Sequence, residues 1–164
     1  MDNPEFYNIT VDGDYAHIFI NEATGTFAAE SSFGNFGYRW TSIGDRDLKQ
    51  FLSSLDLEYF AGKAYHDTYV FDHDKTVSDV REFIDEQAES GYASPEELGL
   101  AMEELEGLGW TQNAHEFIEQ FTATDSLMKI YGGDYYDVIR ESLNPQCKGF
   151  WQKIWPVFLD RIKS

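Results

Sequence analysis

The chain has 164 residues, 42% of them hydrophobic and 16% aromatic, which is enough to bury a core, and we expect one domain spanning residues 1–164. Thirty acidic residues oppose twelve basic ones, and this formal charge of −18 excludes the basic footprint needed to bind nucleic acid directly or an anionic membrane surface. One cysteine excludes an intrachain disulfide. With no transmembrane run and no secretion signal expected, we predict a cytoplasmic protein.

Residues 5–41 have the composition of an antiparallel meander of three or four strands. Runs rich in β-branched and aromatic residues alternate with turn sequences such as Asp12-Gly13-Asp14 and Ala23-Thr24-Gly25. In the last run, aromatic residues alternate with smaller or polar ones, which is typical of a strand with one packed face. The predicted strands cover residues 6–11, 15–20, 26–30 and 36–41.

From residue 45 to residue 163 the apolar residues recur with helical spacing. We expect short helices over residues 48–55 and 57–65, a polar loop over 66–74, and a helix that begins at Thr76 and ends at Gly91. Ser94-Pro95-Glu96-Glu97 predicts a helix N-terminus with a capping box, and Gly107 and Gly109 its end. We expect Thr111 to cap a further helix, and we expect other helical segments over residues 127–131 and 134–143.

The last predicted helix begins at Asn144, with Pro145 at its first position, and carries one long apolar face. Pro156 lies inside this pattern and predicts a kink near residues 152–155. The predicted fold class is α+β, with an N-terminal antiparallel sheet followed by five to seven helices.

The acidic residues are concentrated in one stretch. Between Asp72 and Glu119 there are fourteen acidic residues and only two basic ones. On the predicted helices of residues 76–119, many of these acids face away from the apolar stripe, and we predict that they bind a partner. The predicted partner-binding residues are Asp79, Glu82, Asp85, Glu86, Glu89, Glu96, Glu97, Glu103, Glu104 and Glu106. The alternative is that the acids only keep the protein soluble.

No motif for catalysis is present, so we predict that the protein is not an enzyme, and we expect no cofactor and no functional metal. The segment from His66 to Asp74 contains two histidines and three aspartates and could hold a divalent metal, but it matches no established ligand spacing. Cys147 lies on the apolar face of the last helix, which favours a buried, inert thiol.

A likeness to phage proteins is carried by three segments: Glu30 to Trp40, Lys49-Gln50-Phe51-Leu52, and Tyr59-Phe60-Ala61-Gly62-Lys63. Across residues 6–64 the chain resembles small acidic proteins encoded by tailed phages and prophages of enteric bacteria, a group that implies no activity and no functional residues. By analogy with other small acidic phage proteins, we predict a non-catalytic inhibitor of a host defence complex, of the anti-CRISPR or antirestriction type.

In this hypothesis the acidic surface, in the bacterial cytoplasm, occupies a basic nucleic-acid groove of the host complex, and DNA mimicry is one form that this binding would take. Two alternatives stay open. One is a phage assembly or interaction module whose aromatic residues form an interface. The other is a small metal-dependent enzyme centred on His66, Asp72, His73 and Asp74.

Overall fold

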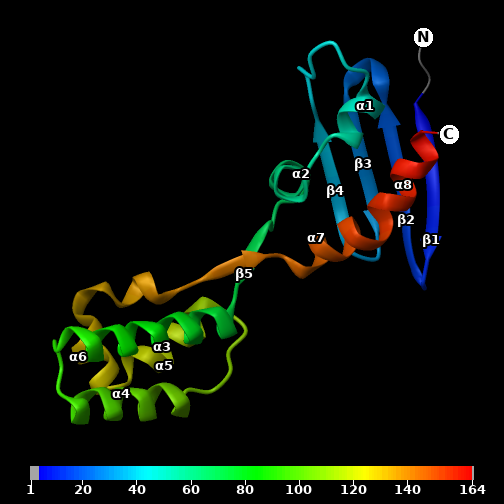
Figure 1. The fold of residues 1–164 in the computed structure, drawn as a ribbon. Coiled ribbons are helices and arrows are strands. Elements are labelled where there is room, and N and C mark those ends of the chain that lie inside the picture. Colours follow the sequence, from blue (N-terminus) through cyan, green and yellow to red (C-terminus); the bar gives the residue numbers. More distant parts are fainter. Residues whose placement is uncertain (1–3, 164) are drawn as a thin grey trace. The chain divides into compact units, whose positions relative to one another are not determined.

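The computed structural model describes residues 4–163, and these fold as two compact units (Figure 1). The sheet unit contains the residues up to Thr68 together with those from Leu143 onward, and the helical unit contains Tyr69–Ser142. The sheet unit takes residues from both ends of the chain, because the C-terminal helices pack on the sheet. That the chain is one domain over residues 1–164 stays a prediction, and residues 1–3 and 164 lie outside the described part.

The sheet unit contains the predicted meander. Its strands are β1 (Glu5–Val11), β2 (Asp14–Asn21), β3 (Thr26–Ser31) and β4 (Gly34–Arg39), which pair antiparallel in the order β1-β2-β3-β4. Asp12 and Gly13 both have positive φ angles, 50° and 84°, as a type I′ hairpin turn requires. The predicted meander is therefore confirmed with four strands, although the last strand covers residues 34–39 instead of the predicted 36–41.

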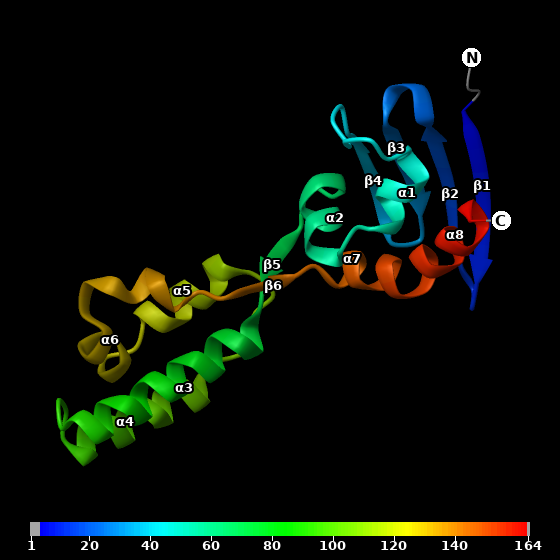
Figure 2. The ribbon, with the colours of Figure 1, turned by 45° about the horizontal axis from the view of Figure 1, so that its top comes forward.

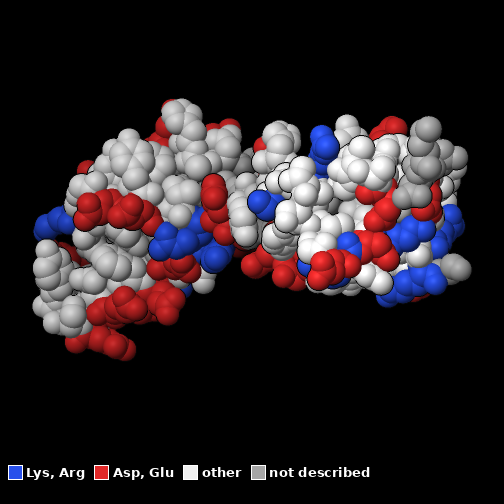
Figure 3. All heavy atoms as spheres, turned by 90° about the horizontal axis from the view of Figure 1, so that it is seen from above, with Lys and Arg blue, Asp and Glu red and all other residues white. Residues whose placement is uncertain are grey.

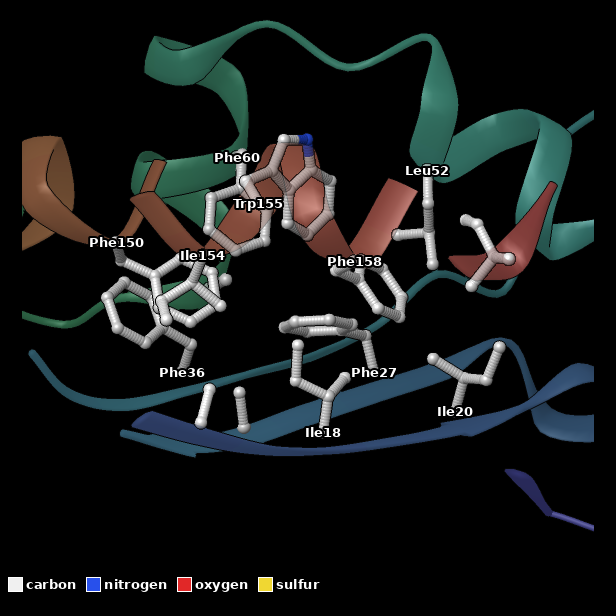
Figure 4. Close-up of a cluster of buried hydrophobic side chains, with 14 of the residues drawn as sticks. Ile18, Ile20, Phe27, Phe36, Leu52, Phe60, Phe150, Ile154, Trp155 and Phe158 are labelled. Carbon is white, nitrogen blue, oxygen red and sulfur yellow. The ribbon is translucent and has the colours of Figure 1, made fainter. Parts of the chain in front are cut away.

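Helices cover one face of this sheet (Figures 1 and 2). They are α1 (Leu48–Ser53), α2 (Leu57–Ala64), α7 (Pro145–Gly149) and α8 (Trp155–Ile162). Inward residues of the strands pack against them in a core of stacked and edge-on rings (Figure 4). Phe27 is at its centre, with its ring centroid 5.6 Å from those of Phe60 and Trp155 and 5.8 Å from that of Phe158.

The C-terminal helix does not break at Pro156. A π-turn over Phe150–Ile154 joins α7 to α8, and the Trp155 N–H donates to the Phe150 carbonyl five residues earlier. The wider turn lies at the predicted kink region, and it adapts the helix to the missing N–H and the ring of Pro156. Buried residues on both sides, including Phe150 and Phe158, stay on the core face.

Two basic side chains reach the edge strand β1. Arg161 of α8 donates from Nη1 to the Asn8 carbonyl at 2.5 Å, and Lys49 of α1 pairs with Glu5 at 2.8 Å. The Arg161 hydrogen bond satisfies an acceptor that the edge of a sheet otherwise presents to other strands.

The helical unit has its own core. Its elements are β5 (Tyr69–Phe71), α3 (His73–Ser90), α4 (Pro95–Gly107), α5 (Ala114–Thr122), α6 (Ser126–Tyr131), the 3₁₀ helix η2 (Gly132–Val138) and β6 (Glu141–Leu143). Val80 and Ile84 of α3, Leu105 of α4, and Phe117 and Phe121 of α5 are almost completely buried. With α7 and α8 counted as one stretch through the π-turn, residues 4–163 contain seven α-helical stretches, and the α+β class is confirmed.

Several predicted boundaries in the helical unit were wrong. The 66–74 segment is not a single loop, because β5 pairs with β6 and Asp72 caps a helix that begins at His73 rather than Thr76. The predicted helix over 134–143 is replaced by the end of η2 and by β6. A strand of three residues is too short to show a sequence periodicity. β5 and β6 form because they pair with each other across some seventy residues of sequence.

Thr111 is not a helix cap. Asn113 caps α5 through a hydrogen bond to the Glu116 N–H, whereas Thr111 is buried and its N–H donates to Nδ1 of His73 at 3.3 Å. The partner of Thr111 thus lies 38 positions earlier in the chain, beyond the range of local capping rules.

Candidate functional site

Helix α3 presents carboxylates on the side opposite its core residues. Val80 and Ile84 are 1% and 2% exposed and point into the core of the helical unit. At about 100° per residue, the exposed acids of the second half of the helix fall within an arc of about 100° on the opposite side. These exposed residues are Glu82, Asp85, Glu86 and Glu89.

Helix α4 packs against α3 and adds further acids. The predicted start is confirmed: Ser94 caps the helix in a capping box with Glu97, and Pro95 lies in the first turn. Leu98, Ala101 and Leu105 are buried, and the exposed acids of this helix are Glu96, Glu103 and Glu106. We call these three and the four exposed acids of α3 the acidic face.

The helical unit carries most of the protein's charge. Residues 69–142 contain eighteen acidic and four basic residues, a formal balance of −14, whereas the remaining residues contain twelve and eight, a balance of −4. Figure 3 shows the Asp and Glu side chains on one face of the molecule as separate groups with basic side chains between them. The negative field therefore comes mainly from the helical unit.

Three of the ten predicted residues have structural partners instead of an open surface. The first is Asp79, which is half-buried and accepts a hydrogen bond from Arg140 Nε at 2.5 Å. Arg140 also donates to the carbonyls of Asp137 and Ile139, and so ties the end of η2 to α3. The Asp79 carboxylate is therefore paired within the helical unit and is not part of a surface open to a partner, contrary to the prediction from helical spacing.

Glu97 is the second acid with structural partners. It accepts hydrogen bonds from the Ser94 N–H at 3.0 Å and the Ser94 hydroxyl at 3.1 Å, and it pairs with Lys129 of α6. Lys129 and, after it, Ser94 lower the pKa of Glu97 to about 2, so this carboxylate stays ionised in mild acid. Its cap role was predicted from the sequence, whereas its pairing with Lys129 was not.

The third is Glu104, which caps the N-terminus of α6. Its carboxylate accepts the N–H groups of Asp125, Ser126 and Leu127, at 3.3, 2.9 and 2.9 Å. Burial by itself raises the pKa of Glu104, but these three N–H groups outweigh it and leave the pKa below its ordinary value of 4.5. A helix of six residues whose own Asp125 makes no capping hydrogen bond thus takes its cap from another helix.

An apolar groove that the sequence analysis missed lies beside these acids. It has a volume of about 360 Å³ and is lined by Tyr92, Leu100 and Ile130 together with Glu97 and Lys129. Tyr92 is 77% exposed and Leu100 49% exposed. One feature of the sequence pointed to this groove: Leu100 lies outside the apolar stripe formed by Leu98, Met102 and Leu105, so its side chain was not needed in the helix core.

The histidine and aspartate side chains of residues 66–74 do not converge on one point as metal ligands would. His66 is exposed beside Asp67, whereas His73 lies in the first turn of α3 with its Nδ1 bonded to Thr111. Within residues 4–163, no group of three or more His, Cys, Asp or Glu side chains has the arrangement to hold a metal ion. Cys147 is 1% exposed, and burial raises the pKa of its thiol to about 11, so the thiolate a nucleophile needs is scarce.

Comparison with known proteins shows the family of the chain. A protein-family model with the description "Phage family" matches residues 2–164, so the chain belongs to this phage family. The match spans both units, whereas the resemblance in the sequence covered only residues 6–64. No curated protein and no solved structure matches the chain. In the part that the structure describes, no helix has both the length and the apolar composition for crossing a membrane.

Proposed function

We propose that the protein is a non-catalytic inhibitor of a host defence complex and acts in the cytoplasm of the infected bacterium. In this proposal, the acidic face binds a basic nucleic-acid-binding surface of a CRISPR effector or restriction enzyme and competes there with DNA or RNA. The observation that carries it is the set of seven exposed carboxylates on two packed helices in a protein of a phage family.

The spacing of the charges supports this proposal. Glu82 to Glu89 covers about 10 Å of helix axis at ~1.5 Å per residue and carries four exposed acids, about one per 2.6 Å. Duplex DNA carries one charge per ~1.7 Å, so this half of α3 is within a factor of about two of DNA. Helix α4, which packs against α3, adds the exposed acids Glu96, Glu103 and Glu106 to the charge of the helical unit.

The clustering of acids on α3 also destabilises the helix, and solubility alone does not require such clustering. Like charges three or four residues apart on a helix destabilise it by about 0.2–0.5 kcal/mol per pair, and Glu82, Asp85, Glu86 and Glu89 form several such pairs. Mixed charges would keep the protein soluble without this repulsion.

The test measures whether the protein competes with labelled nucleic acid for purified defence complexes of the host. The labelled ligand is duplex DNA for restriction enzymes and the target nucleic acid for guide-loaded CRISPR effectors. The informative variant replaces Glu82, Glu86 and Glu89 with Lys. Asp79 is left intact because it pairs with Arg140. We expect this triple variant to lose inhibition and the parent's inhibition to weaken steeply with salt, since contacts to exposed charges are screened over ~8–10 Å.

A matched control replaces Asp45, Glu58 and Asp67 with Lys, which changes the net charge equally at exposed positions of the sheet unit. We expect the control to inhibit like the parent. Equal inhibition by both triple variants would reduce the acidic face to a solubility device, and inhibition without competition would point to an allosteric or enzymatic mechanism. Inhibition of none of the complexes would refute the proposed function.

A further inference from the structure

The face of the sheet that α1, α2, α7 and α8 leave open carries an apolar row across all four strands. The strand register aligns Phe6 of β1 with Phe19 of β2, Ala28 of β3 and Gly37 of β4. Phe6 is 73% exposed, and its ring lies 5.2 Å from that of Phe19. The open face of an antiparallel sheet is ordinarily polar, so this row departs from the expected alternation.

No contact within the described chain explains why residue 37 is a glycine. It lies inside β4, where a glycine weakens a strand, and its φ is not in the left-handed region. A β-carbon at this position would meet only the Phe27 carbonyl oxygen, at an ordinary 3.7 Å. Glycine inside a strand often marks a place where another surface approaches closely.

The open face of the sheet has balanced charges, although the protein as a whole is strongly acidic. A second copy of the chain can therefore approach this face. On either side of the apolar row, the register aligns Asn8, His17, Glu30 and Asn35, and then Asn21, Thr26 and Arg39. Glu30 and Arg39 balance each other, so two copies can approach here without the repulsion that the helical unit, with its balance of −14, would impose.

We propose that this open face is a self-association surface, and that its occupant is the same face of a second copy of the chain. A two-fold axis parallel to the strands would set β1 against the partner copy's β4 and β2 against its β3. Phe6 and Phe19 of each copy would then fill the space above Gly37 and Ala28 of the other, and His17 would face Glu30. Large residues at one end of the row and small ones at the other make it self-complementary, as a two-fold interface requires.

The experiment is sedimentation equilibrium with multi-angle light scattering on the full chain over a wide concentration range. We expect a monomer–dimer equilibrium for the parent. Phe6→Ser should raise the dissociation constant about 100-fold or more, because the symmetric interface loses a buried phenylalanine twice. Gly37→Thr should do the same by filling the space that the partner's ring occupies.

Gly37→Thr separates this proposal from a structural role, since threonine favours a strand, and in the monomer position 37 is exposed and has room for a β-carbon. Its thermal midpoint should equal or exceed that of the parent when both are measured as monomers. The control Tyr92→Ser changes an aromatic residue of similar exposure in the helical unit and should leave the dimer intact. A monomeric parent, or a dimer that persists in both sheet variants, would overturn the proposal. Neither result bears on competition with nucleic acid.

Discussion

Glu104 offers the sharpest test of how the helical unit is held together. Its carboxylate on α4 is the cap of α6, accepting the Ser126 and Leu127 N–H groups at 2.9 Å each. Hydrogen bonds to a charged group contribute about 1.5–3 kcal/mol, and water can partly replace them at a half-buried helix end. We therefore expect Glu104→Ala to lower the free energy of unfolding by about 2 kcal/mol and Glu104→Gln, which keeps one acceptor oxygen, by about 1 kcal/mol.

The assay combines urea unfolding with amide hydrogen exchange measured by NMR. The N–H groups of Ser126 and Leu127 open the helix and have no partner within it, so their protection depends on Glu104. A loss of about 2 kcal/mol corresponds to about 30-fold faster exchange at these two amides. The neighbouring exposed residue provides the control, and Glu103→Ala should change stability by less than about 0.5 kcal/mol.

The pH dependence has a definite sign. The pKa of Glu104 is lowered in the folded protein, so its contribution is complete above the ordinary value of 4.5 and is lost as the pH falls through the folded value. The difference between the parent and Glu104→Ala should be full at neutral pH and shrink in acid. If Glu104→Ala and Glu103→Ala behave alike at neutral pH, the capping role is wrong.

Two further predictions concern the sheet unit and its thiol. A β-carbon at Gly25, whose φ is 67°, would lie 2.0 Å from the Trp40 carbonyl oxygen, so Gly25→Ala should cost at least about 2 kcal/mol in urea unfolding. Gly91 has the same φ with open space around it, so Gly91→Ala should cost only about 1 kcal/mol, and equal costs would contradict the steric argument. Cys147 should resist a disulfide reagent at pH 8 in the native protein and react at once in denaturant, because burial raises its pKa to about 11; fast native labelling would show that this part of the core opens.

Local patterns in the sequence were enough for the meander and for most helix starts. Ser94-Pro95-Glu96-Glu97 and Asn144-Pro145 place their caps within three residues of the groups they bind, so the sequence shows both partners. Thr111 and the strand β6 could not be predicted in this way, because their partners His73 and β5 are distant in sequence.

The same distinction divides the predicted acidic residues. Helical spacing identified the side of α3 and α4 that faces away from the core, and seven of the ten residues are exposed there. Spacing could not show that Asp79 meets Arg140, or that Glu104 meets the start of α6, because those partners come later in the chain and reach the helices only in the folded unit. The acidic face thus contains fewer residues than the sequence pattern predicted.

The order of the two units along the chain has a consequence for synthesis. The sheet is complete once residue 39 has been made and Phe60 of α2 follows soon after, but Trp155 and Phe158, which also cover Phe27, come last. During translation the helical unit, which is continuous from Tyr69 to Ser142, leaves the ribosome with all its core residues before the sheet unit can close. The part of the inner face that α7 and α8 cover must therefore stay exposed on the nascent chain, with α1 and α2 alone available to pack on the sheet. Premature termination before α7 would release a protein with an intact acidic unit and a partly uncovered, aggregation-prone sheet.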